Sequence, residues 1–446
     1  MKKTVEITAL TYGGRGLGRI DNKVVFVPFT VPGDICEVEI TTDKKNFSEG
    51  RLLSVITPSP DRVEAKCPVF TKCGGCHWQH INYKTQLEWK GRIFKETLER
   101  AAGIELPPTV EVVASKKEYR YRTSVGLHVK DGSWGFFAPA SHDIVDIDDC
   151  PLLDERLNET LRKLKTIIFP SFILASLYKV DLTIDLLEEP NAKADDDSVV
   201  VAAFYVTEKI KGFDWNDALK DVQLKGFEVR LKKPVKDQIV RGRGKAFIRS
   251  GDLTVGYEVD GLKLKASSST FRQANLLQNT TLVEKVIEFS KLTEESEVLD
   301  LFCGIGNLTL PLAKRCKSAL GVDADSETIK NAIENAERIG IDNADFLAAE
   351  ATLKVLRNSD PKGVEKETPR VVILDPPRTG AKNTVVEIAA SDTKVERIVY
   401  VSCDPSTLAR DIKVLKEAGY AVENAVCIDM FAETYHIEAV VGLSLI

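Results

Sequence analysis

The chain has 446 residues, of which 43% are hydrophobic and 29% charged, a composition typical of a soluble globular protein with roughly two to four domains. No apolar run is long enough to span a bilayer, and the start MKKTVEITALTYGG lacks the apolar core of a signal peptide, so we expect a cytoplasmic protein with no membrane partner. The net charge of −6 argues mildly against nucleic acid as a partner, but this average hides a local basic block.

The first 60 residues predict a small closed β-barrel. Strands are expected at Thr4–Leu10, Lys23–Pro28, Ile35–Ile40 and Gly50–Ile56, separated by turns in YGGRGLGR, VPGD and TTDKKN. Barrels of this kind often bind oligonucleotides, and a plain packing module is the alternative.

The middle of the chain is mixed in character. Helical spacing predicts one helix over Tyr83–Ala102, with Gly103 as its stop. From about 110 to 265 strand and helix patterns are mixed. Nine Lys and Arg residues lie between Lys225 and Arg249, against two acidic residues. Such a block is usually solvated surface, but the run Arg241-Gly-Arg243-Gly-Lys favours contact with phosphate groups.

From about residue 266 strands and helices alternate. Strands are predicted at 298–302, 318–322, 346–348, 371–374 and 398–401, and helices at 308–315, 326–339 and from Ser406 onward. This alternation predicts an α/β fold whose parallel sheet is covered on both faces.

A ligand site is predicted where the first of these strands ends. The segment Asp300-Leu-Phe-Cys-Gly-Ile-Gly-Asn places an acid before a Gly-x-Gly turn, and Gly304 and Gly306 allow the backbone to turn tightly against a ligand. Asp323 ends the next strand, where a carboxylate can accept hydrogen bonds from both ribose hydroxyls. A dinucleotide-binding loop would carry a third glycine, but Thr309 stands there.

The turn Asp375-Pro-Pro-Arg follows a later strand, and its two prolines fix a rigid, exposed loop. An ordinary strand–loop junction is the alternative. At this edge of the sheet we prefer a substrate-facing turn with Asp375 as a hydrogen-bonding group.

Cys403 ends the apolar run Ile398-Val-Tyr-Val-Ser. A cysteine is by default an inert, buried side chain. This one follows the strand rather than lying inside it, on the expected ligand edge. The start of the next helix is close by, which would favour a thiolate.

The loop Asp300-Leu-Phe-Cys-Gly-Ile-Gly-Asn resembles the first motif of class I S-adenosylmethionine methyltransferases, with Asp323 as the ribose acid. A thiolate beside such a methyl donor suggests pyrimidine chemistry. Addition of the thiolate to C6 makes C5 nucleophilic, and a base must afterwards remove the C5 proton. The final segment DMFAETYHIE offers Glu438, with His436 and Glu433 as rivals, and spacing alone does not choose among them.

These motifs resemble the RNA uracil-5-methyltransferase family, which makes 5-methyluridine in rRNA or tRNA. The resemblance rests on SCDPSTLARD, DPPRTG and the MFAETYHIE ending, while YGGRGLGRIDNKVVFVPFTVPGD is similar to the family's RNA-binding TRAM barrel. It implies a class I, Rossmann-like methyltransferase domain with an N-terminal OB-like barrel and a central α+β domain. It also implies Cys403 as nucleophile, Glu438 as proton-abstracting base and Asp375 as the uracil contact. The family's usual proline before the Thr-x-His-x-Glu motif is Ala432 here, which slightly loosens a turn.

The resemblance further implies an S-adenosylmethionine site. Gln273 contacts the cofactor and Phe271 stacks near the target base, both from the segment STFRQAN. The expected lining residues are Gln273, Asp300, Phe302, Gly304, Asn307, Asp323, Glu350 and Asp375.

Three cysteines are bunched as Cys67-x5-Cys73-x2-Cys76. Three thiolates with His77 or His80 would hold zinc, whereas a [4Fe–4S] cluster needs a fourth thiolate, and Cys150 is the candidate. The residues favour iron–sulfur modestly, and the resemblance favours it strongly, because one branch of the family carries a cluster on this spacing. Methyl transfer needs no redox step, so we expect a structural or RNA-positioning role.

The expected organisation is a barrel over 1–60, a central domain over 61–265 and a methyltransferase domain over 266–446, in a monomer.

The basic and aromatic run Lys116–Thr123 adds Arg120 and Arg122 as RNA contacts, with an amphipathic strand edge as the alternative. The target uridine must leave its stack to react. We expect rRNA of the 23S type as substrate, with a tRNA T-loop uridine as the alternative. Methylation of another group, such as an amino group, and an RNA-binding protein with a non-catalytic cofactor fold are the other hypotheses.

Overall fold

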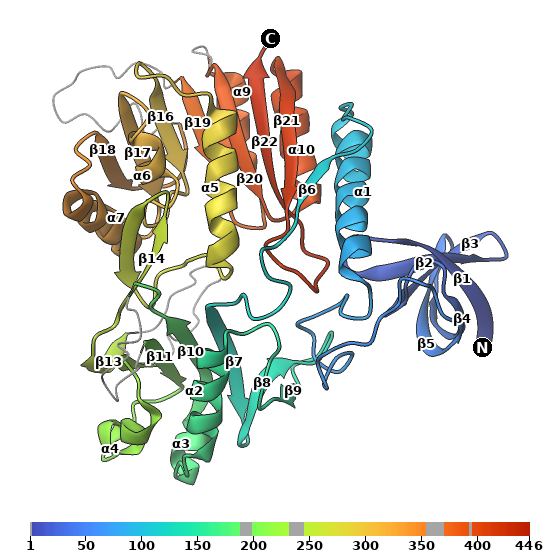
Figure 1. The fold of residues 1–446 in the computed structure, drawn as a ribbon, viewed down its shortest axis with the longest axis horizontal. Coiled ribbons are helices and arrows are strands. Elements are labelled where there is room, and N and C mark those ends of the chain that lie inside the picture. Colours follow the sequence, from blue (N-terminus) through green and yellow to red (C-terminus); the bar gives the residue numbers. More distant parts are fainter. Residues whose placement is uncertain (1, 188–198, 232–244, 354–369, 392–394) are drawn as a thin grey trace. The chain divides into compact units, whose positions relative to one another are not determined.

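The computed structural model describes residues 2–187, 199–231, 245–353, 370–391 and 395–446. The chain folds as two compact units. Figure 1 shows the fold coloured by residue number. The first unit comprises Met1–Glu118 and Leu374–Ile446, and the second comprises Tyr119–Ile373. The N-terminal and C-terminal segments thus share one unit. No helix in the described ranges is long and apolar enough to cross a membrane.

The predicted barrel is confirmed. It closes in the order β1-β2-β3-β5-β4, with strands at Lys2–Leu10, Arg15–Ile20, Lys23–Pro28, Phe47–Thr57 and Ile35–Asp43. Alternate side chains fill its core, among them Ile7, Val27 and Val38, as a period-two pattern requires. Strand β2 was missed, because its glycines read as a turn. They serve instead for close approach: a Cβ at Gly18 would lie 2.3 Å from the Glu6 carbonyl oxygen.

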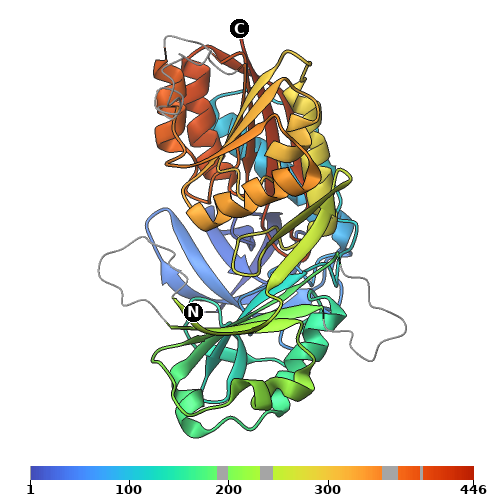
Figure 2. The same cartoon turned by 90° about the vertical axis from the view of Figure 1, so that its left-hand side faces the viewer.

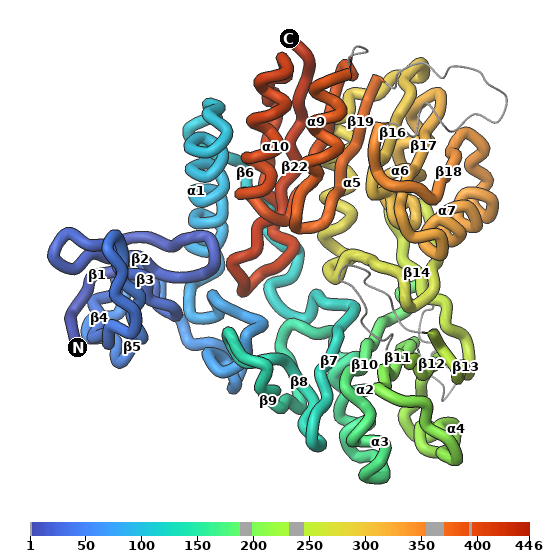
Figure 3. Tube along the Cα trace, turned by 180° about the vertical axis from the view of Figure 1, so that it is seen from behind, coloured from blue at the N-terminus to red at the C-terminus, as the bar shows by residue number. Residues whose placement is uncertain are grey.

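Helix α1 spans Tyr83–Ala102, as predicted. The Asn82 side chain accepts the Thr85 N–H at its start, and Gly103 ends it at a left-handed φ of 63°. Helix α1 packs against α10 (Pro405–Glu417), and the two lie side by side in Figure 3.

The first unit also holds four sheet strands, in the order β20-β22-β21-β6. Their bounds are Arg397–Ser402, Glu438–Leu445, Tyr420–Ile428 and Glu111–Val113. Strand β22 is antiparallel to both neighbours, and β6 pairs in parallel with β21. Strand β6 was not predicted, because three residues carry no periodicity that a sequence window can detect. Helix α9 covers Lys382–Ala390.

The second unit contains a seven-stranded sheet in the order β13-β12-β11-β10-β7-β8-β9. Helices α2 (Glu155–Thr166) and α3 (Ser171–Ser176) pack against its strands, and Figure 2 views this part from the side. The strand bounds in the same order are Ala246–Gly251, Gly226–Leu231, Val200–Val206, Leu177–Ile184, Ser124–Lys130, Ser133–Phe137 and Ile144–Asp146. Helix α4 (Trp215–Leu219) and the short turn η1 (Lys220–Val222) lie between β11 and β12.

The rest of the second unit has the predicted strand–helix alternation. Strands lie in the order β18-β17-β16-β19, and β16, β17 and β18 are parallel. Their bounds are Ala344–Ala348, Ser318–Asp323, Glu297–Leu301 and Val371–Leu374. The helices are α5 (Leu276–Ser290), α6 (Thr309–Ala313) and α7 (Ser326–Ile339), and the hairpin β14-β15 spans Thr254–Val259 and Leu262–Ser267.

The basic block is only partly available for phosphate. Lys225 pairs with Asp185 at 2.5 Å, and Arg230 pairs with Glu228 at 2.5 Å, all four side chains being buried. These two cations neutralise buried acids, so the charge count overstated the basic surface. Arg241 and Arg243 lie outside the described residues.

A buried ion pair joins α1 to the loop that precedes β22. The Lys90 ammonium lies 2.6 Å from Asp429, and their side chains are 1% and 0% exposed. Lys90 also donates to the Phe431 carbonyl oxygen at 3.1 Å, and the Tyr83 hydroxyl donates to Asp429 at 2.7 Å. Both charges are therefore paired and hydrogen-bonded, as buried charges must be.

Replacing Lys90 by methionine should lower the free energy of unfolding by about 3–5 kcal/mol, because Asp429 would remain buried without its counter-charge. The measurement is urea unfolding followed by circular dichroism. The double variant Lys90→Met/Asp429→Asn should recover part of the loss, since no unpaired charge then remains.

Lys84→Met is the matched control, since Lys84 lies on the exposed side of the same helix with a loose pair to Glu88 at 3.9 Å. Its effect should stay within about 0.5 kcal/mol. A loss below about 1 kcal/mol for Lys90→Met would contradict the importance of the buried pair.

Candidate functional site

Strand pairing brings Cys403 and Glu438 together. Ser402, the last residue of β20, is paired with Ala439 of β22, so the next residue outward on each strand is Cys403 and Glu438 respectively. Glu438 is also paired with Ile428 of β21, so a neighbouring strand lies on each side of it. The register therefore sets a thiol opposite a buried carboxyl group.

Asp375 and Arg378 complete this group. Asp375 follows β19 directly, and Arg378 lies in the same proline-containing turn. Both are close enough to Cys403 and Glu438 to act on the pKa of each. The Arg378 guanidinium also lies 3.5 Å from the His436 ring.

Helix α10 holds the turn of Asp375 in place. The buried Asp411 accepts the Ala381 N–H at 2.8 Å and the Tyr400 hydroxyl at 2.7 Å, and Arg410 donates to the Thr379 carbonyl oxygen at 3.0 Å. Gly380 fits because a Cβ there would come within 2.6 Å of Asp411. The Arg-Asp end of the SCDPSTLARD motif thus positions the DPPRTG turn, a role that the sequence alone did not reveal.

Burial favours the protonated forms of the three acidic groups in the site. Burial raises the pKa of the Cys403 thiol to about 11, with Glu438 and Asp375 adding to the rise and Arg378 opposing it. Burial raises the pKa of Asp375 to about 7 and that of Glu438 well above its ordinary value. We expected the helix start to favour a thiolate; burial and the neighbouring carboxyl groups dominate instead.

One rival of Glu438, Glu433, has other partners. Glu433 is buried, and its side chain and N–H are both hydrogen-bonded to Gln86 of α1, at 3.2 and 3.1 Å. The Glu433 carbonyl oxygen accepts the N–H groups of His77 and Trp78. These contacts fix the loop before Glu438 to the segment that follows the clustered cysteines.

The predicted cofactor loop lies in the second unit. The Val322 carbonyl oxygen accepts the N–H groups of Phe302 and Cys303 at 2.8 and 3.1 Å, and the Gly304 N–H donates to Asp323 at 3.2 Å. Phe302 has a φ of 70° and Gly304 one of 57°. A Cβ at Gly304 would meet no atom within 4 Å, so open space lies before the loop, where a ligand can approach the backbone.

Two predicted lining residues support this loop through their side chains. Asp300 is fully buried and accepts the Thr309 hydroxyl at 2.5 Å. Asn307 exchanges two amide hydrogen bonds with Asn279, at 2.8 and 3.0 Å, and accepts the Tyr257 hydroxyl.

The remaining predicted residues of this region differ in exposure. Gln273 is half-buried in the segment between β15 and α5, and Glu350 is exposed just after β18. Phe271 is 70% exposed.

The clustered cysteines lie in the segment that connects β5 to α1. Cys67, Cys73 and Cys76 are half-exposed, and the Cys73 sulfur accepts the Gly75 N–H at 3.4 Å. Burial and the nearby Cys67 raise the pKa of Cys73. Burial lowers the pKa of both His77 and His80 to about 4, so both rings are neutral. Within the described ranges, no group of three or more His, Cys, Asp or Glu side chains is placed to hold a metal ion.

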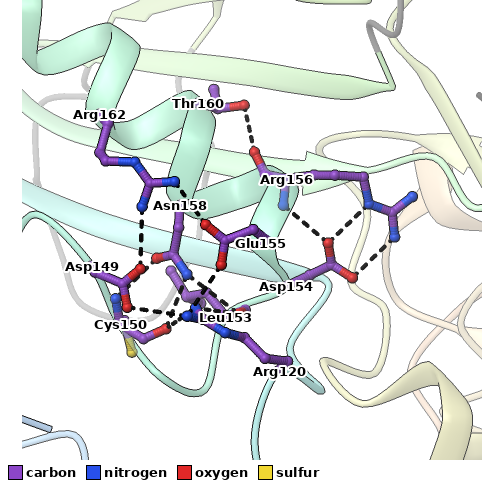
Figure 4. A network of polar contacts seen from close by, with 10 residues as sticks. All are labelled: Arg120, Asp149, Cys150, Leu153, Asp154, Glu155, Arg156, Asn158, Thr160 and Arg162. Carbon is purple, nitrogen blue, oxygen red and sulfur yellow. Dashed lines mark hydrogen bonds and ion pairs between the residues drawn. The ribbon is translucent and has the colours of Figure 1, made fainter.

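Cys150 lies in the second unit, in a loop braced by polar contacts (Figure 4). Arg120 donates to the Cys150 carbonyl oxygen at 3.1 Å and pairs with Glu155 at 3.1 Å, and Asn158 accepts the Cys150 N–H at 2.9 Å. Arg120, predicted as an RNA contact, thus also holds the backbone of Cys150. Arg122 is half-buried, and its backbone bonds with Leu152 and Asp154.

Comparisons with known proteins identify the family. Residues 82–445 match the family described as tRNA (Uracil-5-)-methyltransferase, and residues 2–53 match the TRAM domain. An "Uncharacterized RNA methyltransferase" of Clostridium tetani is 32% identical over 98% of this chain and 94% of that protein. The "23S rRNA (uracil(1939)-C(5))-methyltransferase RlmD" of Pectobacterium atrosepticum is 33% identical over 98% of this chain and 92% of that protein.

Among solved structures, the tRNA (uracil-54, C5)-methyltransferase of Pyrococcus abyssi, in complex with S-adenosyl-L-homocysteine, has a TM-score of 0.75 and 27% identity. The match covers 99% of this chain and 100% of that one. With the family match over most of its length and an N-terminal TRAM barrel, the chain belongs to the tRNA (uracil-5-)-methyltransferase family.

Proposed function

We propose that this protein transfers a methyl group from S-adenosylmethionine to C5 of a uridine in 23S rRNA. The observation that carries the proposal is the strand register that sets Cys403 opposite Glu438, with Asp375 and Arg378 beside them. Methylation of an amino group needs no thiol in the site, so this geometry favours uridine chemistry. A tRNA uridine is the second candidate, because the similar Pyrococcus abyssi structure is of a tRNA enzyme.

The residues act in sequence. Cys403 loses its proton to solvent and its sulfur bonds to uridine C6, which leaves C5 electron-rich; C5 would then take the methyl group from the sulfonium. Glu438, which must first release its own proton to solvent, removes the C5 proton, the C5–C6 double bond re-forms and the C6–sulfur bond breaks, so that the Cys403 thiolate leaves. Asp375 hydrogen-bonds the uracil, which fits its pKa of about 7, since near neutral pH it can serve as donor or acceptor. The target uridine must be flipped out of its stack.

S-adenosylmethionine would lie at the loop of Phe302 and Gly304. It supplies an electrophilic methyl group on a sulfonium. The open space at Gly304 fits a ligand there, and Asp323 can accept hydrogen bonds from a ribose. Gln273, Asn307 and Glu350 would line the site. Asp300 would not contact the cofactor itself. Its buried carboxylate accepts the Thr309 hydroxyl and so would support the loop that does.

RNA contacts are proposed at three further places. The exposed ring of Phe271 would stack near the target base. Arg120 and Arg122 would approach phosphates, as would Arg241 and Arg243. The protein would work as a monomer in the cytoplasm.

Loss of the gene should remove 5-methyluridine from one rRNA position and leave tRNA unchanged. The measurement is nucleoside mass spectrometry of fragments from both RNA pools of a deletion strain. Complementation with the Cys403→Ala variant is the control and should not restore the modification. Loss of 5-methyluridine from tRNA alone would move the substrate to tRNA.

Glu438→Gln should form a covalent protein–RNA adduct and release it about 100-fold more slowly than the wild type, since a general base typically contributes that factor. The adduct is measured as radiolabelled RNA that migrates with the protein on a denaturing gel. Cys403→Ala should give none, and Glu417→Gln, at an exposed position of α10, should behave as wild type. Turnover by wild type with no adduct in Glu438→Gln would refute the mechanism.

We also propose that Cys67, Cys73, Cys76 and Cys150 hold a [4Fe–4S] cluster. Support comes from donor chemistry: three half-exposed thiols share one glycine-containing loop, and one sulfur already accepts a backbone N–H, as cluster sulfurs do. Zinc is the alternative. The proposed role is structural, because the same segment continues into the His77 and Trp78 amides that hold the loop before Glu438.

Anaerobically purified protein should contain about four iron and four sulfide per chain, the content of one such cluster. Iron and acid-labile sulfide are measured directly. Cys73→Ser should lose most of both, while Cys316→Ala, a buried packing position, should keep them. Stoichiometric zinc with no sulfide would overturn the assignment.

A further inference from the structure

Four aromatic side chains from three separate segments meet beside Cys403. We call Tyr12, His77, Tyr435 and His436 the aromatic rim. The Tyr435 ring centroid lies 5.5 Å from Tyr12, 4.6 Å from His77 and 4.4 Å from His436, so Tyr435 is the centre of the group. All four side chains are half-exposed.

The rim adjoins the reacting groups at two points. The Tyr12 hydroxyl donates to Asp404, the residue after Cys403, at 3.1 Å. His436 lies two residues before Glu438 and 3.5 Å from Arg378, which is exposed. One residue of the rim thus contacts the neighbour of Cys403, and another lies beside the cation that acts on the pKa of Cys403.

Packing alone accounts poorly for this arrangement. Trp78 already connects the cysteine segment to the barrel loop between β1 and β2. It is fully buried, and its indole N–H donates to the Gly14 carbonyl oxygen at 3.2 Å. The rim rings lie next to it but keep part of their surface open. Aromatic rings that stay open beside a cation are what unpaired nucleotides require, because bases stack on rings and phosphates pair with cations.

We propose that the aromatic rim binds an unpaired base of the RNA next to the target uridine, with Tyr435 as the stacking platform. The inference rests on the proposed function. A uridine that is flipped toward Cys403 leaves its neighbour without a stacking partner, and the rim offers a replacement on the protein. The rim joins the barrel loop, the cysteine segment and the loop of Glu438, so a bound base would contact all three.

The test compares Tyr435→Leu with Tyr435→Phe, because phenylalanine keeps the ring and leucine removes it. With rRNA from a deletion strain, Tyr435→Leu should raise the KM for RNA about 5-fold to 100-fold, the range of one lost stacking contact. The KM for S-adenosylmethionine should not change, and Tyr435→Phe should stay within about twofold of wild type. Phe172→Leu, at a half-exposed ring on α3, is the control and should change neither KM.

A second measurement does not depend on turnover. In Tyr435→Trp the new indole should be quenched when a short oligouridylate binds, above any change in the wild type, because a stacked base quenches it. If wild type methylates rRNA but Tyr435→Leu keeps its KM, or if the indole is not quenched, the rim does not bind a base. Equal losses in Tyr435→Leu and Tyr435→Phe would likewise assign the residue to packing. Failure of wild type to methylate either RNA pool would refute the proposed function instead.

Discussion

The antiparallel register of β20 and β22 is the constraint on which the candidate active site depends. It joins the last residue of one strand to the first residues of the other, so Cys403 and Glu438 become neighbours although 35 positions separate them in the chain. Because strand side chains alternate between faces, a slip of one residue would turn Glu438 to the opposite face of the sheet. The pairing of β22 with β21 on its other edge makes such a slip costly.

Around that pair, burial shifts the acidic groups toward their protonated forms. Two carboxyl groups and a thiol share one nearby cation, Arg378, and burial raises the pKa of all three acids. The thiol of Cys403 and the carboxyl group of Glu438 must therefore each lose a proton before they can act in the proposed reaction.

The sequence predicted much of this fold where the signal was local. Helix α1 and strand β19 have the predicted bounds, because caps, glycines and apolar runs mark their ends. The sequence did not predict elements that depend on contacts between residues far apart in the chain. Strand β6 is defined by its pairing with β21, and β2 is a strand because its glycines allow close approach to β1. The site followed the same rule. Cys403 and Glu438 were predicted from motifs that resemble a known family, whereas the positioning role of Asp411 depends on side chains meeting across the fold.

The same distinction explains how the cysteine loop relates to the chemistry. In sequence it lies more than 350 residues before Glu438, yet its last turn donates two N–H groups to Glu433, and α1, which follows, supplies Gln86 and the buried Lys90. These partners thus help to hold the loop before Glu438 in its shape. A group bound by the cysteines would thus stabilise the position of the base without taking part in methyl transfer. That division of labour explains how a thiol-rich segment can belong to an enzyme whose reaction needs no electron transfer.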